Sequence, residues 1–275
     1  VIALPDIAVH DAMVRFKFWP YPWERVQGQM AWEHPRLTIS RLTGQYGGET
    51  LLEVDNGGEP TAAVLDVLPQ GELAWQLHLE DVRIRRLIPD AVLRRSLIPS
   101  GVDAIVEKLD PRGPLDLDLG LDVKGYRQPA NLVTAAWHLD ARLQNNTVVP
   151  GVELSNVSGL VKIVRGSRDG ARSFVDGYFE LDSATALGVP FTAISGPFLV
   201  DGDDAYVGTP TWPEARTVPP YDPAINKYAR RGDDVGDVQA DVYGGKVGIN
   251  VQSRLSPRDP EQSTYRAAVT VRDAR

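Results

Sequence analysis

The sequence of 275 residues contains no cysteine, and it has only four histidines and two methionines. Without cysteine, the chain can form neither a disulfide nor a thiolate metal site. No stretch approaches the run of about eighteen apolar residues that a membrane-spanning helix needs. Basic residues are not in excess, because the formal net charge is -8, so we do not expect a partner of the nucleic-acid class.

The motifs of common catalytic and metal-binding sites are also missing. The histidines stand far apart, with no His-Glu-x-x-His pair. The glycine pairs at 47–48 and 244–245 lack the spacing and the lysine of a phosphate-binding loop. Residues 201–204 resemble the start of a calcium loop, but Trp212 stands where the bidentate glutamate belongs. We therefore predict a protein that is not an enzyme and has no cofactor and no metal.

Short β patterns, in contrast, are abundant, and some of them repeat. A hexad of apolar, hydroxyl, any, apolar, hydroxyl and glycine residues occurs at 39–44, 154–159 and 191–196. A Tyr-Gly-Gly phrase occurs at 46–48 and 243–245, each time ahead of an apolar-rich strand pattern. Repetition of this kind predicts re-used β units, and we interpret each hexad as a strand followed by a turn or bulge at its glycine.

The clearest strand pattern lies at residues 115–123, where five apolar residues alternate with Asp116, Asp118, Asp122 and a glycine. Because side chains at i, i+2 and i+4 spread along a strand, we interpret the aspartates as a solvated face and not as a calcium or acid/base cluster. The remaining strands are predicted at 72–84, 135–143, 175–181, 191–207, 238–255 and 264–271. In the strand at 72–84 the apolar parity changes near Glu80 and Asp81, which predicts a β-bulge.

Three other segments have distinct patterns. Residues 88–109 predict two short helices that cap a sheet, and residues 208–236 predict a long proline-rich loop. Residues 14–18 alternate as a strand and lead into an aromatic cluster. That cluster, which contains Trp19, Tyr21 and Trp23, is either a carbohydrate or partner platform or a set of rings that plugs the end of a sheet.

These patterns predict a mostly β protein with a strongly curved antiparallel sheet, which must close, stack against a second sheet or hold something else, and with a short helical segment near 88–109. We expect a β unit at 1–110 that ends in the helical cap, and a repeating antiparallel unit at 111–275. The start lacks methionine and a signal sequence, and the end follows a strand directly. The chain is therefore expected to be a piece of a longer or processed protein.

The hexads, the Tyr-Gly-Gly phrases and the passage Leu-Asp-Pro-Arg-Gly-Pro-Leu-Asp-Leu-Asp-Leu at 109–119 resemble the AsmA-like and TamB-like envelope proteins of Gram-negative-type bacteria. The likeness covers residues 35–275 and is strongest over 100–200 and 236–272. The resemblance implies that the curved antiparallel sheet forms a repeating β-groove or half-pipe, which carries or bridges phospholipids in the periplasm. It also implies an inner-membrane anchor that lies outside this chain. The proline-rich segment after residue 208 departs from the family pattern.

Our main functional hypothesis is therefore a module of the cell envelope that holds or conducts phospholipid acyl chains for lipid transport or outer-membrane biogenesis. An ordinary closed β-sandwich would explain the same apolar face. The alternative from another class is an extracellular carbohydrate- or protein-binding module that uses the aromatic cluster, and a weaker third is a glycan-active β-solenoid enzyme. The candidate groove-lining residues are Leu115, Leu117, Leu119, Leu121, Val123, Trp137, Leu139, Leu154, Val157, Phe191, Ile194, Val247, Ile249 and Val251.

Overall fold

The computed structural model describes residues 3–15, 20–55, 63–68, 70–97, 106, 109–127, 133–149, 152–169, 172–201, 204–208, 237–254 and 264–272. Within these residues the protein is mostly β, with one antiparallel sheet of 15 strands and a single short helix. The predicted fold class is confirmed in this respect. Clustering of the chain into compact units gives two, one formed by Val1–Ala141 with Arg168–Ala171 and one formed by Arg142–Ser167 with Arg172–Arg275.

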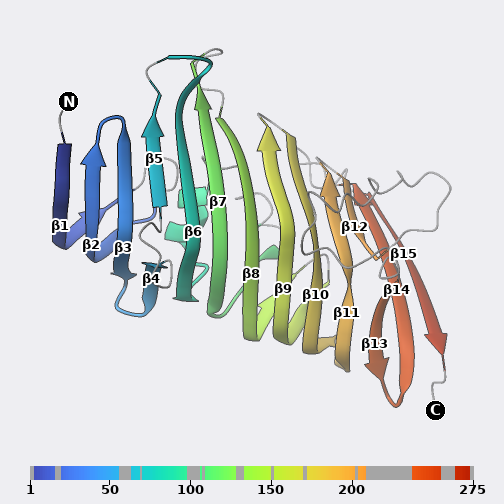
Figure 1. The fold of residues 1–275 in the computed structure, drawn as a ribbon. Helices are drawn as coiled ribbons and strands as arrows, with labels where there is room; N and C mark the ends of the chain where they lie inside the picture. Colours follow the sequence, from blue (N-terminus) through green and yellow to red (C-terminus); the bar gives the residue numbers. More distant parts are fainter. Residues whose placement is uncertain are drawn as a thin grey trace. The chain divides into compact units, whose positions relative to one another are not determined.

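The first unit contains the helix and the strands that precede it (Figure 1). Its strand order is β1-β2-β3-β4-β6-β7-β8, and β5 pairs with β3 and β6. The domain boundary expected at residue 110 falls inside this unit. Its elements are β1 (Ala3–Val14), β2 (Trp23–Glu33), β3 (Arg36–Tyr46), β4 (Thr50–Asp55), β5 (Ala63–Val67), β6 (Leu73–Leu87), α1 (Ala91–Leu97), β7 (Leu115–Tyr126) and β8 (Val133–Val148), whose last residues belong to the second unit.

The second unit is all β in its described residues. Its strand order is β9-β10-β11-β12-β14-β13, and β15 pairs with the other side of β14. Its strands are β9 (Leu154–Asp169), β10 (Arg172–Ala186), β11 (Val189–Asp201), β12 (Asp204–Val207), β13 (Val238–Val242), β14 (Gly245–Arg254) and β15 (Thr264–Arg272).

The bulge predicted in the strand at 72–84 is confirmed. The register of β6 against β7 shifts between Leu79 and Val82, where Asp81 adopts a φ of 49°. A second shift follows between Ile84 and Leu87, where Arg86 has a φ of 55°. Each extra residue changes the parity of the strand, so apolar side chains on both sides of it face the same way.

The hexads also carry an irregularity, but not at the predicted position. In the first hexad the register of β3 against β2 skips Ser40, and both Ile39 and Leu42 contact the same buried core although they are three residues apart. In the other two hexads the third residue has a positive φ, with 53° at Asn156 and 49° at Ala193. The first hexad thus contains a bulge, and the third is irregular against β13, where the register shifts between Thr192 and Ser195.

The prediction for the hexad glycines is confirmed at Gly159 only, and close packing is a second role. Gly159 does have a positive φ of 133°, but a Cβ at this position would also overlap the backbone of Leu181. At Gly196 a Cβ would overlap Val238, without a positive φ. These glycines allow a neighbouring strand to approach closely. The Tyr-Gly-Gly phrases, as predicted, each precede a strand, β4 and β14.

The other predicted strands overlap β6 to β8 and β10 to β15, with differences of a few residues at their ends. Helix α1 confirms the first half of the helical segment, and Val106 and Leu109 are helical in the second half. Residues 98–105, residues 107–108 and the loop at 209–236 lie outside the described residues. The strand predicted at 14–18 does not begin at Val14, because Val14 is the last residue of β1 and Arg15 is in no strand. Residues 16–19 are outside the described part of the chain.

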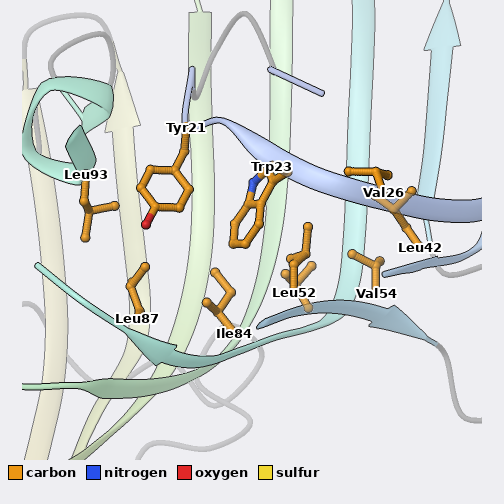
Figure 2. Close-up of a cluster of buried hydrophobic side chains, with 10 residues drawn as sticks. Tyr21, Trp23, Val26, Leu42, Leu52, Val54, Ile84, Leu87 and Leu93 are labelled. Carbon is orange, nitrogen blue, oxygen red and sulfur yellow. The ribbon is translucent and has the colours of Figure 1, made fainter. Parts of the chain in front are cut away.

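The core of the first unit lies between β4 and β6 on one side and α1 with residues 21–23 on the other (Figure 2). Leu52, Val54 and Ile84 project from β4 and β6, and Figure 2 shows Tyr21, Trp23 and Leu93 pointing at them from outside that part of the sheet. The whole cluster comprises Tyr21, Trp23, Val26, Leu42, Leu52, Val54, Val82, Ile84, Leu87 and Leu93.

Candidate functional site

The apolar face of the first unit begins with a covered part, where α1 and residues 20–23 lie over the sheet. Asp90 caps the helix, because its Oδ1 accepts hydrogen bonds from the backbone N–H groups of Val92 at 3.0 Å and Leu93 at 2.8 Å. The Tyr46 hydroxyl donates to Asp90 Oδ2 at 3.4 Å. The helix is thereby fixed above the core with Leu93 pointing down into it.

The aromatic cluster belongs to this cover. Tyr21 and Trp23 are both 0% exposed, and their ring centroids lie 5.1 Å apart in an edge-on arrangement. Tyr21 also contacts the ring of Tyr46, with centroids 4.6 Å apart. Burial is the main reason that the pKa of Tyr21 is raised. The hypothesis that Tyr21 and Trp23 form an exposed binding platform is therefore wrong, because neither ring is accessible; Trp19 lies outside the described residues.

Beyond the covered part, the same face continues as a set of side chains that we call the open face: Trp75, Leu77, Leu121, Val123, Trp137 and Leu139. None of these residues belongs to the buried cluster or to the hydrophobic residues packed against it. Leu77 and Val123 are buried directly opposite each other, whereas the other four side chains are half-buried. The open face is thus the part of this apolar surface that lies outside the buried cluster.

Strand register shows that the open face is continuous with the core. Leu79 packs against the buried cluster and stands opposite Leu121, and Leu77 is two residues before Leu79 on β6, with no bulge between them. Side chains two residues apart on a regular strand share a face. Leu77 and Leu121 therefore project to the same side as the core.

The face on which Trp137 and Leu139 of β8 lie follows from the contact between His138 and β7. A Cβ at Gly120 would overlap the imidazole of His138, so this imidazole lies on the face opposite to Leu119 and Leu121. Trp137 and Leu139 flank His138 in sequence and consequently project onto the apolar face. At the far end of the face, Trp75 lies across Gly125, where any larger residue would overlap the indole.

The reverse side of β6 and β7 is polar. Asp118 pairs with Arg85 at 2.5 Å, and Asp122 lies 2.6 Å from Nδ1 of His78. Asp116 accepts a hydrogen bond from the backbone N–H of Arg86 at 2.8 Å. Each of the three carboxylates has its own partner on β6, which supports their interpretation as the wet face of a strand.

The structure divides the candidate groove-lining residues into groups. Leu115, Leu117 and Leu119 pack against the covered core, while Leu121, Val123, Trp137 and Leu139 lie on the open face. In the second unit Val157 and Val247 are buried, and the side chains of Leu154, Phe191, Ile194, Ile249 and Val251 are half-buried. The sequence prediction omitted Trp75 and Leu77, although the alternation in the strand at 72–84 was the signal that could have included them.

Comparison of the chain with protein-family models, curated proteins and solved structures found no match. Among the described residues, no helix is long and apolar enough to span a membrane. The described histidine, aspartate and glutamate side chains form no group of three that could hold a metal ion.

Proposed function

We propose that the open face holds phospholipid acyl chains and that the protein is a non-enzymatic, lipid-binding module of the cell envelope. The observation that supports this most directly is the change along one apolar face. Under α1 and residues 20–23 the side chains of the buried cluster are at most 5% exposed, and half-buried leucines of β7 pack against them. Farther along, Trp75, Leu121, Trp137 and Leu139 are half-buried and lie outside that cluster. Apolar surface of this kind marks a binding site for an apolar partner.

The chemistry of the open face fits an acyl chain better than a polar ligand. Its six side chains are aliphatic or indole groups, and the ion pairs of β6 and β7 are on the reverse side. Each methylene that moves from water to such a surface contributes about 0.8 kcal/mol. A segment of several methylenes would therefore bind measurably without any charged contact. The resemblance to lipid-carrying envelope proteins agrees with this assignment.

The test is lipid binding by the complete 275-residue chain. The protein is expressed in a bacterial host, examined by native mass spectrometry, extracted with organic solvent and then titrated with a fluorescent phospholipid. We expect co-purified phospholipid and saturable binding of the probe. The critical variant is Leu139→Asp, which places a carboxylate on the open face and should reduce probe affinity at least about tenfold through the cost of burying charge.

The matched control is His138→Asp, the same new side chain one residue away on the polar face. It should leave probe affinity unchanged. Circular dichroism and denaturation by urea must show that both variants are folded. A lipid-free protein that does not bind the probe, or equal loss in both variants, would contradict the proposal and favour a closed β-sandwich.

A further inference from the structure

The last strand of the second unit, β15, is an open sheet edge with an exposed apolar stripe. β15 pairs with β14 from Thr264↔Arg254 to Arg272↔Lys246 without any register shift, and no described strand pairs with its other side. In Figure 1 it is the outermost strand beside β14. Val269 is 62% exposed and Val271 is 58% exposed, although their partners on β14, Ile249 and Val247, are half-buried and buried. A long, regular and apolar edge of this kind is a template for another strand.

The other sheet edge, β1, is protected against such pairing. It contains Pro5, which lacks a backbone N–H donor, and its register against β2 shifts three times. Asp11 lies at one of these irregularities with a φ of 50°. Bulges and proline are the usual devices that keep an edge strand from pairing. β15 has neither device in its nine residues.

Charge along β15 indicates which strand would fit. Its two charged residues, Arg266 and Arg272, are both basic. Arg272 stands directly opposite Lys246, which itself forms an ion pair with Asp241 at 3.4 Å on the other side. The row across the three strands is therefore acidic, basic, basic. Opposite charges on facing positions stabilise a strand pair and like charges destabilise it, so the next position in this row favours a carboxylate.

We propose that β15 is a docking edge to which a strand of another protein adds, with carboxylate side chains facing Arg272 and apolar side chains facing Val269 and Val271. A second copy of this chain fits less well. Two β15 strands would bring together four arginines and no acidic residue, and β1 cannot form nine regular pairs because of Pro5 and its bulges. This inference does not depend on lipid binding at the open face.

The experiment uses two fluorescently labelled nine-residue peptides and the complete chain. One peptide alternates valine with threonine and glutamate (Thr-Val-Glu-Val-Thr-Val-Glu-Val-Thr), and the other has lysine in place of glutamate. We expect fluorescence anisotropy to show about tenfold tighter binding of the acidic peptide at low salt, and an advantage that decreases as salt rises. In Arg272→Glu the preference should reverse.

A second variant tests the apolar stripe. Val269→Lys should weaken both peptides, whereas Val152→Lys, at another exposed valine outside any strand, should weaken neither. Circular dichroism checks that each variant is folded, and if Arg272→Glu is not, the peptide comparison on the unchanged protein still decides. Equal affinity for the two peptides would overturn the proposal. Self-association that Val269→Lys abolishes, together with no peptide binding, would also overturn it and identify a second copy as the occupant.

Discussion

The covered part and the open face of the first unit share β6 and β7, yet only the covered part contacts α1 and residues 20–23. β7 contributes to both, since Leu117 packs against the buried cluster and Leu121, four residues later, does not. Apolar residues alternate with polar residues or glycine along both parts of β7. What differs is the presence of α1 and of residues 20–23 above one part only. Enclosure is thus decided by α1, by residues 20–22 and by the start of β2 at Trp23, and not by β7.

An apolar strand face is therefore not by itself a core or a binding site. Where Tyr21 and Trp23 supply the second layer, the face becomes a core with buried side chains. Where half-buried indoles such as Trp137 remain, the same kind of face can receive a ligand. Variants in the two parts should therefore differ first in stability and then in binding.

The largest expected effect comes from truncating one tryptophan in each part. Trp23→Ala should lower the free energy of unfolding by about 3–5 kcal/mol, because the indole is fully buried and its loss leaves a cavity. Trp137→Ala should lower it by less than about 2 kcal/mol, since its indole keeps contact with solvent. Urea denaturation followed by circular dichroism measures both. Equal losses would mean that the open face is as enclosed as the core.

The next effect concerns the cover itself. Leu93→Ala should destabilise the protein by about 2–4 kcal/mol, because Leu93 is the side chain of α1 that is buried in the cluster, whereas Val92 only packs against it. It should also increase the fluorescence of an added hydrophobic dye as the covered part becomes accessible. Arg95→Ala is the control on the exposed side of the same helix and should change neither measurement by much. A silent Leu93→Ala variant would show that α1 does not close the core.

A smaller effect is expected at the bulge of β6, between the side chains that join the two parts. Asp81 has a φ of 49°, which β-branched residues adopt with difficulty and glycine adopts freely. Asp81→Val should therefore cost about 1–3 kcal/mol, and Asp81→Gly should be close to neutral. Thermal unfolding of the pair measures the difference. If valine were tolerated as well as glycine, the bulge would not be what aligns Leu79 with Val82.

Period-two alternation predicted β6 to β8 and the polar reverse face, whereas β1, β2 and β5 were not predicted. Residues 115–123 alternate without interruption, and the structure places them on β7 with the aspartates toward β6. The parity change at Glu80 and Asp81 was equally readable, because a bulge is the simplest way to restore an apolar face. The bulge within the first hexad was not predicted. Its signal is that the two apolar residues Ile39 and Leu42, three positions apart, contact the same core.

Enclosure could not be predicted from the same pattern. Nothing in the alternation distinguishes Leu117, which contacts the core, from Leu121, which does not. That distinction depends on where Tyr21, Trp23 and Leu93 pack, and these contacts are far apart in sequence. The aromatic cluster illustrates the limit, because composition alone does not tell a buried plug from an exposed platform.

The smallest expected effect is a pH dependence beside the open face. Asp66 on β5 accepts hydrogen bonds from Nε of Arg36 at 2.7 Å and from Nε2 of Gln76 at 3.0 Å, one position from Val67 and its partner Trp75. The hydrogen bond from Arg36 is the main reason that the pKa of Asp66 lies below its ordinary value, and Gln76 lowers it further against the opposing effect of burial.

Because this pKa is lower in the folded protein than in the unfolded chain, the pair stabilises the fold above the ordinary aspartate pKa of about 4 and loses that contribution as pH falls through the lowered value. Asp66→Asn should therefore be less stable than the unchanged protein at pH 6, and the difference should shrink toward pH 3. Salt should reduce it too, since Arg36 is largely exposed. Denaturation by urea across this pH range is the measurement, and Arg36→Gln should show the same trend. A difference that stays constant with pH would mean that the Asp66 carboxylate contributes nothing that its amide analogue lacks, and that β5 is held beside the open face by its backbone pairing alone.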